Sequence, residues 1–547
     1  MKQNIIIILI GLTLIACGNT ASNGDSNGGN NVGTVSVIST QPTDGSSKVL
    51  TNTVVSASFD ADMDITSLDT NSFSLAGGSP VSGSISYDAA SRTASFIPDV
   101  PLSPGTQYTA TLTTSVTASN SATLEEVYTW SFTSEDFIKR VSVDSSGSEI
   151  AGDSYEATTS ADGRYVAFSS DATNLVTGDT NGHSDVFVHD SQTGTTTRVS
   201  VDSSGKQAIN GNSYPHSISS DGRYVAFRSS ATNLVANDTN GQRDIFVHDT
   251  QTGSTTRVNV DSSGNQTVNG HSYAPSISAD GRYVAFHSSA TNLVADDTNG
   301  QADIFMHDTQ TNTTIRVNVG PSGSQANFHS TTPSISANGR YVAFESSATN
   351  LIAVDTNDVD DVFVHDTQAG TTTRVSVDSS GTQAINGRSH SPSISADGRY
   401  VAFDSDATNL VAGDTNGLRD IFIHDTQTGI TTRVSIDSSG AQAMSGNSFS
   451  PSISADGRYV AFESYATNLV TNDTNGQRDI FVHDTKTGTT TRVNINSSNT
   501  QAMSYDGENA SISADGRYVV FESTASNLVN SDTNVQYDVF RVLNAAP

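Results

Sequence analysis

The sequence predicts an all-β protein, in which a β-sandwich precedes a seven-bladed β-propeller that is closed by an N-terminal strand. Two observations support this fold class. A DGRY-type turn recurs seven times at nearly constant spacing, and the composition is dominated by Ser, Thr, Asn and Gly, which favour short strands and turns over helices. With 547 residues, the chain is long enough for one large repeat architecture and additional domains.

Residues 1–17 read as an export signal. Lys2 precedes an apolar run at 5–15 that is too short to span a bilayer comfortably, and the run ends in Leu-Ile-Ala-Cys17, with the only cysteine of the chain. These residues resemble the lipobox of bacterial lipoproteins. The resemblance implies cleavage before Cys17, lipidation of its thiol and, because Gly18 follows, a place in the outer membrane. An ordinary signal peptide with a chance cysteine is the alternative.

Residues 18–33 contain almost no apolar side chains and are expected to form a flexible tether. Residues 34–136 then alternate in short strands, and Trp130 is expected in the core of the last of them. The order QPTDGSSKV, VVSASFDADMD, PLSPGTQYTATL and YTWSFTS resembles the bacterial Ig-like domain, which implies a spacer or adhesion module. For Asp60, Asp62 and Asp64, a solvated loop is favoured over a metal loop.

The remainder repeats one pattern. The turns begin at Asp162, Asp221, Asp280, Asn338, Asp397, Asp456 and Asp515, so the spacing is 59, 59, 58, 59, 59 and 59 residues. Such a period with strand-type sequence indicates a propeller or a solenoid. Each repeat divides into four strands, a to d, for example PSIS, YVAFHS, DIFMHD and TTIRVNV, which is typical of a propeller blade.

The two ends of residues 137–547 complement each other. FIKRVSVD at 137–144 is a d strand without a blade before it, and the last repeat stops after its c strand. We expect the first segment to complete the last blade, which removes two exposed edges. An open solenoid would need polar caps instead. ISADGRYVAF resembles the repeats of the periplasmic protein TolB, and VFVHDTQTG resembles WD-type repeats; both resemblances imply a propeller and leave the function open.

The connections predict where binding occurs. The a–b and c–d turns are short, whereas the b–c and d–a connections, which must share the opposite face, are long, polar and acidic. Connections that exceed what closure requires are often functional, so we expect the binding face on the long-loop side.

Each b–c loop carries two Asp six residues apart with an Asn between them, a shortened calcium-type pattern of oxygen ligands. Turn chemistry, in which Asp and Asn bond to the backbone, is the alternative interpretation. The predicted calcium ligands are Asp179, Asn181, Asp185, Asp238, Asn240, Asp244, Asp297, Asn299, Asp303, Asp414, Asn416, Asp420, Asp473, Asn475 and Asp479; the same pattern occurs at Asp355/Asn357/Asp361 and Asp532/Asn534/Asp538.

One position varies while its neighbours do not, namely the residue after YVAF. It is Ser169 in the first repeat and then Arg228, His287, Glu345, Asp404, Glu463 and Glu522. We expect the last six to form a polar binding surface with an acidic arc; a solvated position that accepts any polar residue is the alternative.

Charge and motifs narrow the function. The formal net charge of -31 opposes nucleic-acid binding, and one cysteine excludes a disulfide framework or a Cys-ligated zinc site. We therefore expect a monomeric cell-envelope lipoprotein that binds a protein or glycan partner, with calcium as the one candidate cofactor. The alternative is a lyase or glycosidase acting on extracellular polysaccharide, although no catalytic motif is present.

Overall fold

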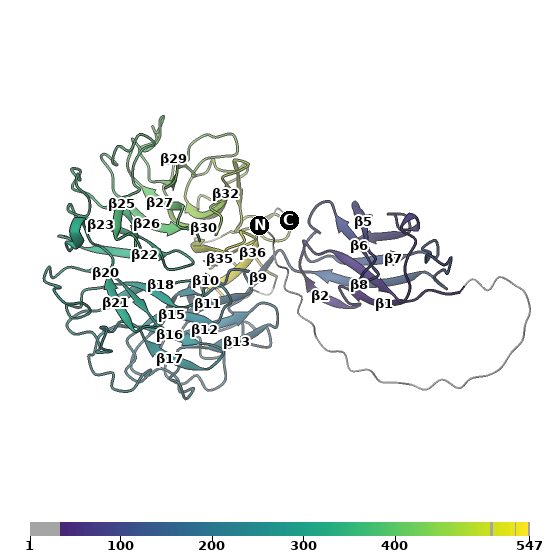
Figure 1. Ribbon diagram of the computed structural model, residues 1–547, viewed down its shortest axis with the longest axis horizontal. Helices are drawn as coiled ribbons and strands as arrows, with labels where there is room; N and C mark the ends of the chain where they lie inside the picture. The colour runs from purple at the N-terminus through teal and green to yellow at the C-terminus, as the bar shows by residue number, and fades with distance from the viewer. Residues whose placement is uncertain (1–32, 504–506, 531, 545–547) are drawn as a thin grey trace, which may run out of the picture. The chain divides into compact units, whose positions relative to one another are not determined.

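The computed structural model describes residues 33–503, 507–530 and 532–544, which form two compact units (Figure 1). The sandwich unit comprises 33–102 and 106–134, and the repeat unit comprises 103–105 and the residues from 135 onward. The expected signal, Cys17 and most of the expected tether lie outside the described residues. Within the described ranges, regular structure is β-strand apart from two short 3-10 turns, η1 (Ile65–Ser67) and η2 (Pro321–Gly323), so the all-β prediction is confirmed. This part of the chain has no helix long and apolar enough to cross a membrane.

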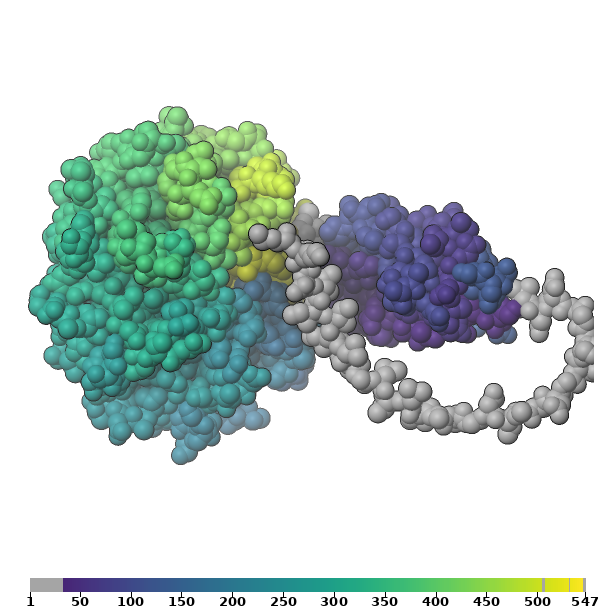
Figure 2. All heavy atoms as spheres, in the orientation of Figure 1, coloured from purple at the N-terminus to yellow at the C-terminus, as the bar shows by residue number. Residues whose placement is uncertain are grey.

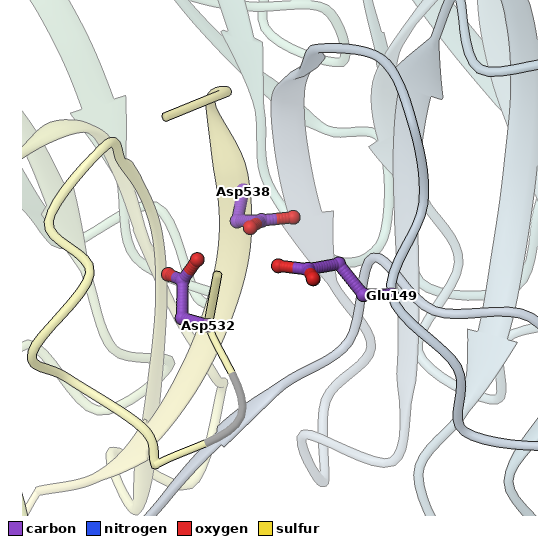
Figure 3. A group of neighbouring side chains, drawn as sticks. All are labelled: Glu149, Asp532 and Asp538. Atoms are coloured by element: carbon purple, nitrogen blue, oxygen red, sulfur yellow. The ribbon is translucent and has the colours of Figure 1, made fainter. Parts of the chain in front are cut away.

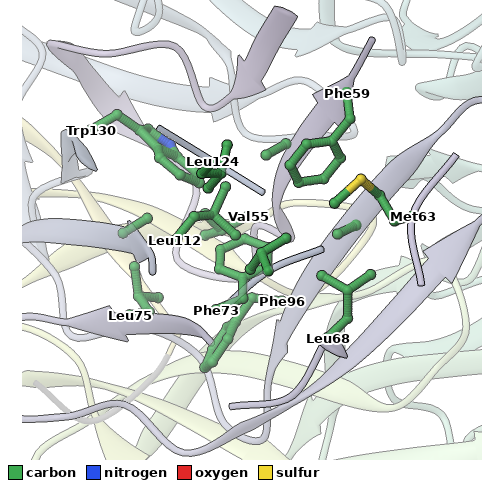
Figure 4. Close-up of a cluster of buried hydrophobic side chains, with 14 of the residues drawn as sticks. Val55, Phe59, Met63, Leu68, Phe73, Leu75, Phe96, Leu112, Leu124 and Trp130 are labelled. Atoms are coloured by element: carbon green, nitrogen blue, oxygen red, sulfur yellow. The ribbon is translucent and has the colours of Figure 1, made fainter. Parts of the chain in front are cut away.

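The sandwich unit consists of two four-stranded sheets with the orders β1-β3-β6-β5 and β2-β8-β7-β4. Alternating side chains fill the core between them, where Phe73 packs on Phe96 and Trp130 (Figure 4). Trp130 is buried in the last strand, as predicted. The strands are β1 (Val37–Gln41), β2 (Ser46–Val49), β3 (Val55–Phe59), β4 (Phe73–Ala76), β5 (Gly83–Asp88), β6 (Thr93–Pro98), β7 (Gln107–Leu112) and β8 (Tyr128–Ser134).

Strand β2 of this unit is not marked by the alternation of apolar and polar residues that predicts the other strands. The segment of β2 is SSKV and lies mostly at the surface, so it lacks the apolar alternation that marks a half-buried strand. The favoured interpretation of the Asp60–Asp64 loop agrees with the structure. Asp62 pairs with Arg92 at 2.8 Å, and Asp64 accepts a hydrogen bond from the backbone of Thr66.

The repeat unit contains seven four-stranded antiparallel sheets, here numbered 1 to 7. Sheet 1 has β10 (Ser154–Thr159), β11 (Tyr165–Ser170), β12 (Asp185–Asp190) and β13 (Thr195–Arg198); sheet 2 has β14 (Ser213–Ile218), β15 (Tyr224–Ser229), β16 (Asp244–Asp249) and β17 (Ser254–Arg257); sheet 3 has β18 (Ser272–Ile277), β19 (Tyr283–Ser288), β20 (Asp303–Asp308) and β21 (Thr313–Arg316); sheet 4 has β22 (Ser330–Ile335), β23 (Tyr341–Ser346), β24 (Asp361–Asp366) and β25 (Thr371–Arg374). Sheet 5 has β26 (Ser389–Ile394), β27 (Tyr400–Ser405), β28 (Asp420–Asp425) and β29 (Ile430–Arg433); sheet 6 has β30 (Ser448–Ile453), β31 (Tyr459–Ser464), β32 (Asp479–Asp484) and β33 (Thr489–Arg492). Sheet 7 has β34 (Glu508–Ile512), β35 (Tyr518–Ser523), β36 (Asp538–Leu543) and β9 (Ile138–Arg140).

Sheet 7 joins the two ends of the repeat unit. Phe540 faces Arg140 and Val542 faces Ile138 in the antiparallel ladder between β36 and β9, so the expected pairing of the segment at 137–144 is present (Figure 1). The first strands of the sheets contact one another in the order β10, β14, β18, β22, β26, β30 and β34, and β34 contacts β10 in turn.

The apolar core of the repeat unit lies between successive sheets. Val186 of sheet 1 clusters with Phe227 of sheet 2, and the equivalent cluster recurs between later sheets. In the DGRY turn of sheet 2, Gly222 has φ of 75°, and a Cβ there would lie 2.2 Å from the ring of Tyr165 in sheet 1. The turn therefore needs glycine both for its left-handed backbone and for the close approach of the neighbouring ring. Side chains fill the gaps between the ribbons (Figure 2).

The two ends of each sheet differ as the connections predict. At the short-loop end, Arg223 of the a–b turn pairs with Asp249 of the c–d turn through bonds of 2.9 and 2.7 Å. At the long-loop end, Gln207 of a d–a loop bonds to Thr180 of a b–c loop at 2.8 Å. The a strands begin earlier than expected; β18 starts at Ser272 instead of Pro275, with a bulge after Tyr273.

Candidate functional site

The Asp pairs of the b–c loops hold the arginine that ends strand d. Arg257 Nη1 lies 3.2 Å from both Asp238 and Asp244. Asn240 donates from its Nδ2 to Asp244 at 3.1 Å and to the carbonyl of Thr267 at 3.3 Å, so its amide nitrogen faces the carboxylate. The same arrangement occurs in every sheet; the arginines are Arg140, Arg198, Arg257, Arg316, Arg374, Arg433 and Arg492.

This geometry differs from a calcium loop. A guanidinium already lies between the two carboxylates, and the Asn joins the b–c loop to the next d–a loop. The structure therefore favours the alternative interpretation, a turn and loop anchor, for the predicted ligands; these are Asp179, Asn181, Asp185, Asp238, Asn240, Asp244, Asp297, Asn299, Asp303, Asp414, Asn416, Asp420, Asp473, Asn475 and Asp479. The arginine was missed because it lies on a distant strand, although it recurs 13 residues after the second Asp of each loop from sheet 1 to sheet 6.

Sheet 7 has an additional carboxylate in this cluster. Oxygens of Glu149, Asp532 and Asp538 lie within 4.8 Å of one another (Figure 3). Arg140 Nη1 contacts all three, at 2.8, 3.4 and 3.1 Å. Glu149 bonds to the backbone of Thr533 where the other repeats use a Gln, as Gln207 does with Thr180. Because Arg140 contacts each carboxylate, the cluster resembles the other six with one more negative charge.

The variable residues after YVAF lie opposite residues of strand a that also vary. Arg228 faces Tyr214, His287 faces Tyr273, and Glu463 faces Phe449. The a strands line a central pocket of about 480 Å³ to which all seven sheets contribute. Its polar lining residues include Glu156, His216, Thr332, Ser391, Ser450 and Asn509.

Backbone bulges shape the wall of this pocket. Glu156, Thr332, Ser391 and Ser450 have φ between 47° and 52°, a left-handed conformation that costs a non-glycine residue on the order of 1–2 kcal/mol. Two polar atoms of the lining, Glu156 Oε2 and Thr332 Oγ1, are buried without a hydrogen-bond partner within the protein. Strained backbone and buried polar atoms without a hydrogen bond are features that ligand-binding sites share.

Sheets 1 to 3 contribute aromatic and cationic groups. Arg228 pairs with Glu156 at 2.6 Å, bonds to His216 Nε2, and lies 4.8 Å above the ring of Tyr214. His287 stacks on Tyr273 with ring centroids 5.3 Å apart. Burial and the charge of Arg228 lower the pKa of His216 to about 3, and burial lowers the pKa of His287 to about 4. Both imidazoles are therefore neutral at pH 7.

Sheets 4 to 7 contribute the carboxylates of the predicted acidic arc, but most are buried. Asp404, Glu463 and Glu522 are 1–2% exposed. They join neighbouring sheets: Glu463 accepts a hydrogen bond from Asn509 N at 2.8 Å, and Glu522 accepts one from Ala157 N at 3.2 Å. The expectation of an exposed arc, and equally the solvated alternative, is wrong for these three residues, because the next sheet covers the end of strand b.

The pKa values of these carboxylates diverge. Burial raises the pKa of Glu463 to about 7 and that of Glu522 to about 8. Burial also acts on Glu345, but hydrogen bonds from His390 and Thr331 outweigh it and lower the pKa to about 2. The predicted contact residues thus divide into Arg228 and His287, partly exposed Glu345, and three buried groups between sheets.

Sequence reasoning missed several residues of the site. Glu156 and His216 line the pocket, and Arg243 lies 4.9 Å above the ring of Tyr273. Two signals in the sequence could have found them. Strand a, which carries Glu156 and His216, has positions that vary together with the residue after YVAF. The residue before strand c, which is Arg243 in sheet 2, varies as well. That last position is Ser184, Arg243, Ala302, Asp360, Arg419, Arg478 and Tyr537 in sheets 1 to 7.

Comparisons with known proteins found distant structural likenesses and one family match. Distant structural likenesses include an oligogalacturonate lyase in complex with manganese (12% identity, TM-score 0.45, 74% of this chain and 92% of that chain). They also include a protein described as TolB from Agrobacterium tumefaciens (15%, 0.33, 52% and 81%) and a puromycin-hydrolysing peptidase from Mycobacterium tuberculosis (12%, 0.42, 74% and 55%). No curated protein matches the chain. Residues 32–134 match the family model of the bacterial Ig-like domain, so the chain carries such a domain ahead of its all-β repeat unit.

Proposed function

We propose that the protein is a cell-envelope lipoprotein that binds a partner through its repeat unit. Cys17 anchors it to the outer membrane, residues 18–33 are the tether, and the Ig-like domain is the spacer. In this proposal residues 137–547 are a seven-bladed β-propeller, and the pairing of β9 with β36, which joins the first and last segments of the repeat unit, supports its closure. The partner is an envelope or extracellular protein or a glycan, bound by a monomer at the long-loop end.

One observation carries the binding proposal. Most side chains of the repeat unit recur in all sheets with the same partners, whereas those that differ gather around the long-loop end of the central pocket. Four of the six arginines outside the recurring positions illustrate this, since Arg228, Arg243, Arg419 and Arg478 contact variable residues there. Arg541 is an exception, since it bonds to Gly163 at the short-loop end. Side chains that recur in every sheet are expected of a stable scaffold. Side chains that differ between sheets and lie at one place are expected of a binding site.

The test is capture by the purified full-length mature protein of envelope proteins and of glycans on an array. We expect Glu156→Gln, which keeps the size of the side chain but removes its charge from the pocket, to lower capture at least tenfold. Arg164→Ala at the short-loop end is the matched control and should leave capture unchanged. Equal capture by the E156Q variant and the wild type, with an unchanged melting temperature, would contradict the proposal.

An enzyme acting on polysaccharide is the second candidate. Arg228 bonds to both Glu156 and His216, and this arrangement favours an enzyme. Glu156 and His216 are able to transfer protons, and Arg228 could neutralise an acidic sugar. Incubation with neutral and uronic polysaccharides, followed by analysis of chain length, tests it. Products that disappear with the E156Q variant would establish the enzyme in place of the binding module.

A further inference from the structure

Six d–a loops of the repeat unit present an apolar side chain to solvent at the long-loop end. These residues are 42–73% exposed. In five loops they occupy the same position, two residues after a recurring Gln, and in the loop of sheet 4, which is one residue shorter, the apolar residue is one place further on. Their identity changes while their apolar character does not. They are Ile209, Val268, Phe328, Ile385, Met444 and Met503, here called the apolar ring.

Hydrogen bonds fix the backbone of the loops at these positions. The backbone N–H of Ile209 donates to Asn233 Oδ1 at 2.8 Å, and Asn233 Nδ2 donates back to the carbonyl of Gln207 at 2.9 Å. On the other side, Asn181 Nδ2 donates to the carbonyl of Ala208 at 3.0 Å. Equivalent bonds fix Val268, Ile385, Met444 and Met503. A surface that is already ordered loses little entropy on binding, which suits recognition.

The long connections that carry the apolar ring, and the b–c loops, are rich in acidic side chains. Asp171, Asp296 and Asp358 of the b–c loops are exposed. The d–a loops add Asp202, Asp261, Asp378 and Asp437, whose pKa values lie below the usual range, chiefly because hydrogen bonds in the DSSG turns outweigh burial, so that they are charged at pH 7. The negative charge of this surface repels a second copy of the same surface and repels an anionic lipid headgroup. The same charge attracts a basic partner.

We propose that the apolar ring docks a basic protein, which inserts apolar side chains between the loops while its cationic residues face the aspartates of the long connections. This inference rests on the proposed function and deepens it by choosing a protein over a glycan as the partner at the long-loop end. Apolar anchors provide the contact, and the aspartates provide orientation and a salt-dependent association rate.

The experiment uses the full-length mature protein and two fixed probes, a peptide array and a glycan array. The peptides are basic with apolar anchors, acidic with the same anchors, or basic without anchors. The ring variant is Val268→Ser/Ile385→Ser/Met444→Ser. The matched control is Ile315→Ser/Ile430→Ser, which removes two apolar residues that are 37% and 52% exposed and lie on the outer strands β21 and β29.

We expect basic peptides with anchors to be retained at least tenfold more strongly than either other class. The ring variant should lose at least tenfold of this retention, the control variant should keep it, and high salt should weaken it. Retention that is independent of charge, or equal in the ring variant, would overturn the inference. Glycan binding that the E156Q variant abolishes and the ring variant leaves intact would also overturn it, but would uphold the proposed function. Binding of neither probe would overturn the inference alone, since envelope capture tests the function separately.

Discussion

The two ends of the repeat unit use charge in opposite ways. At the short-loop end, each Arg of a DGRY turn lies over the following Tyr and, in six sheets, pairs with the Asp that ends strand c, as Arg164 does with Asp190 at 2.7 Å. At the long-loop end, charges around the pocket differ from sheet to sheet and join different partners. The short-loop end is thus a repeated structural device, whereas the long-loop end combines a repeated anchor, the Asp–Arg–Asp cluster, with residues that break the repetition.

Of the substitutions considered, removal of a buried carboxylate from the Asp–Arg–Asp cluster should lower the stability of the repeat unit most. Asp303 is fully buried, contacts Arg316 at 3.3 Å and accepts from Asn318 at 2.6 Å. We expect Asp303→Ala to lower the free energy of unfolding of the repeat unit by about 3–5 kcal/mol, because Arg316 loses its buried partner. Denaturant unfolding followed by circular dichroism measures this. Asp171→Ala, at an exposed position, should change stability by less than about 0.5 kcal/mol.

The carboxylates between sheets should show a pH dependence that the anchors lack. With its pKa raised from 4.5 to about 8, folded Glu522 keeps its proton where the unfolded chain has lost it. Its contribution is complete below about pH 4.5 and is lost as the pH rises through 8. Glu522→Gln avoids this loss, so its stability relative to the wild type should increase between pH 5 and pH 9, by on the order of a few kcal/mol.

Asp190→Asn is the control for that comparison. Burial acts to raise the pKa of Asp190, but hydrogen bonds from Arg164 and from the backbone of Gln192 outweigh it and lower the pKa from 3.8 to about 2, so its contribution is present above about pH 4 and does not change between pH 5 and pH 9. The variant should therefore be destabilised equally at both pH values. Parallel melting curves for the Glu522→Gln and Asp190→Asn variants would show that the buried position of Glu522 has no effect on its titration.

The short-loop ion pairs should matter less. The side chain of Arg164 is 35% exposed. Arg164→Ala should cost within about 1 kcal/mol, because solvent screens the pair. A loss as large as that from D303A would remove the distinction between the two ends.

Trp130, the only tryptophan, lies in the sandwich unit, so its fluorescence separates the unfolding of that unit from the unfolding of the repeat unit.

Calcium should have the smallest effect. Since a guanidinium lies between each pair of carboxylates in the b–c loops, we expect the arginine to take the place of a cation, so that the melting temperature is the same in millimolar Ca²⁺ and in chelator. A rise of several degrees would show that Ca²⁺ displaces or supplements the arginine, through mass action on the folded state. Differential scanning calorimetry provides the measurement.

Sequence alone determined the elements that depend on local pattern. The 59-residue period, the four strands of each repeat and the separation of short from long connections follow from turn residues and alternation, which are local properties. The terminal segment at 137–144 was also identifiable, because a strand without its blade is visible in the repeat count. The arginine between each Asp pair and the burial of three residues of the acidic arc were not predicted for a shared reason, since each depends on what a distant strand places beside a side chain.

Only the tertiary structure decided those contacts. Arg257 reaches Asp244 because strands β16 and β17 pair, and Asn509 reaches Glu463 because sheet 7 packs against sheet 6. The burial and pKa of a residue depend on these neighbours and not on its own sequence context. Glu345 and Glu522 occupy equivalent positions in two repeats, yet the pKa of Glu345 is lowered to about 2 and that of Glu522 is raised to about 8. A periodic sequence specifies the shape of each sheet, whereas the packing of one sheet on the next specifies what its polar groups can do.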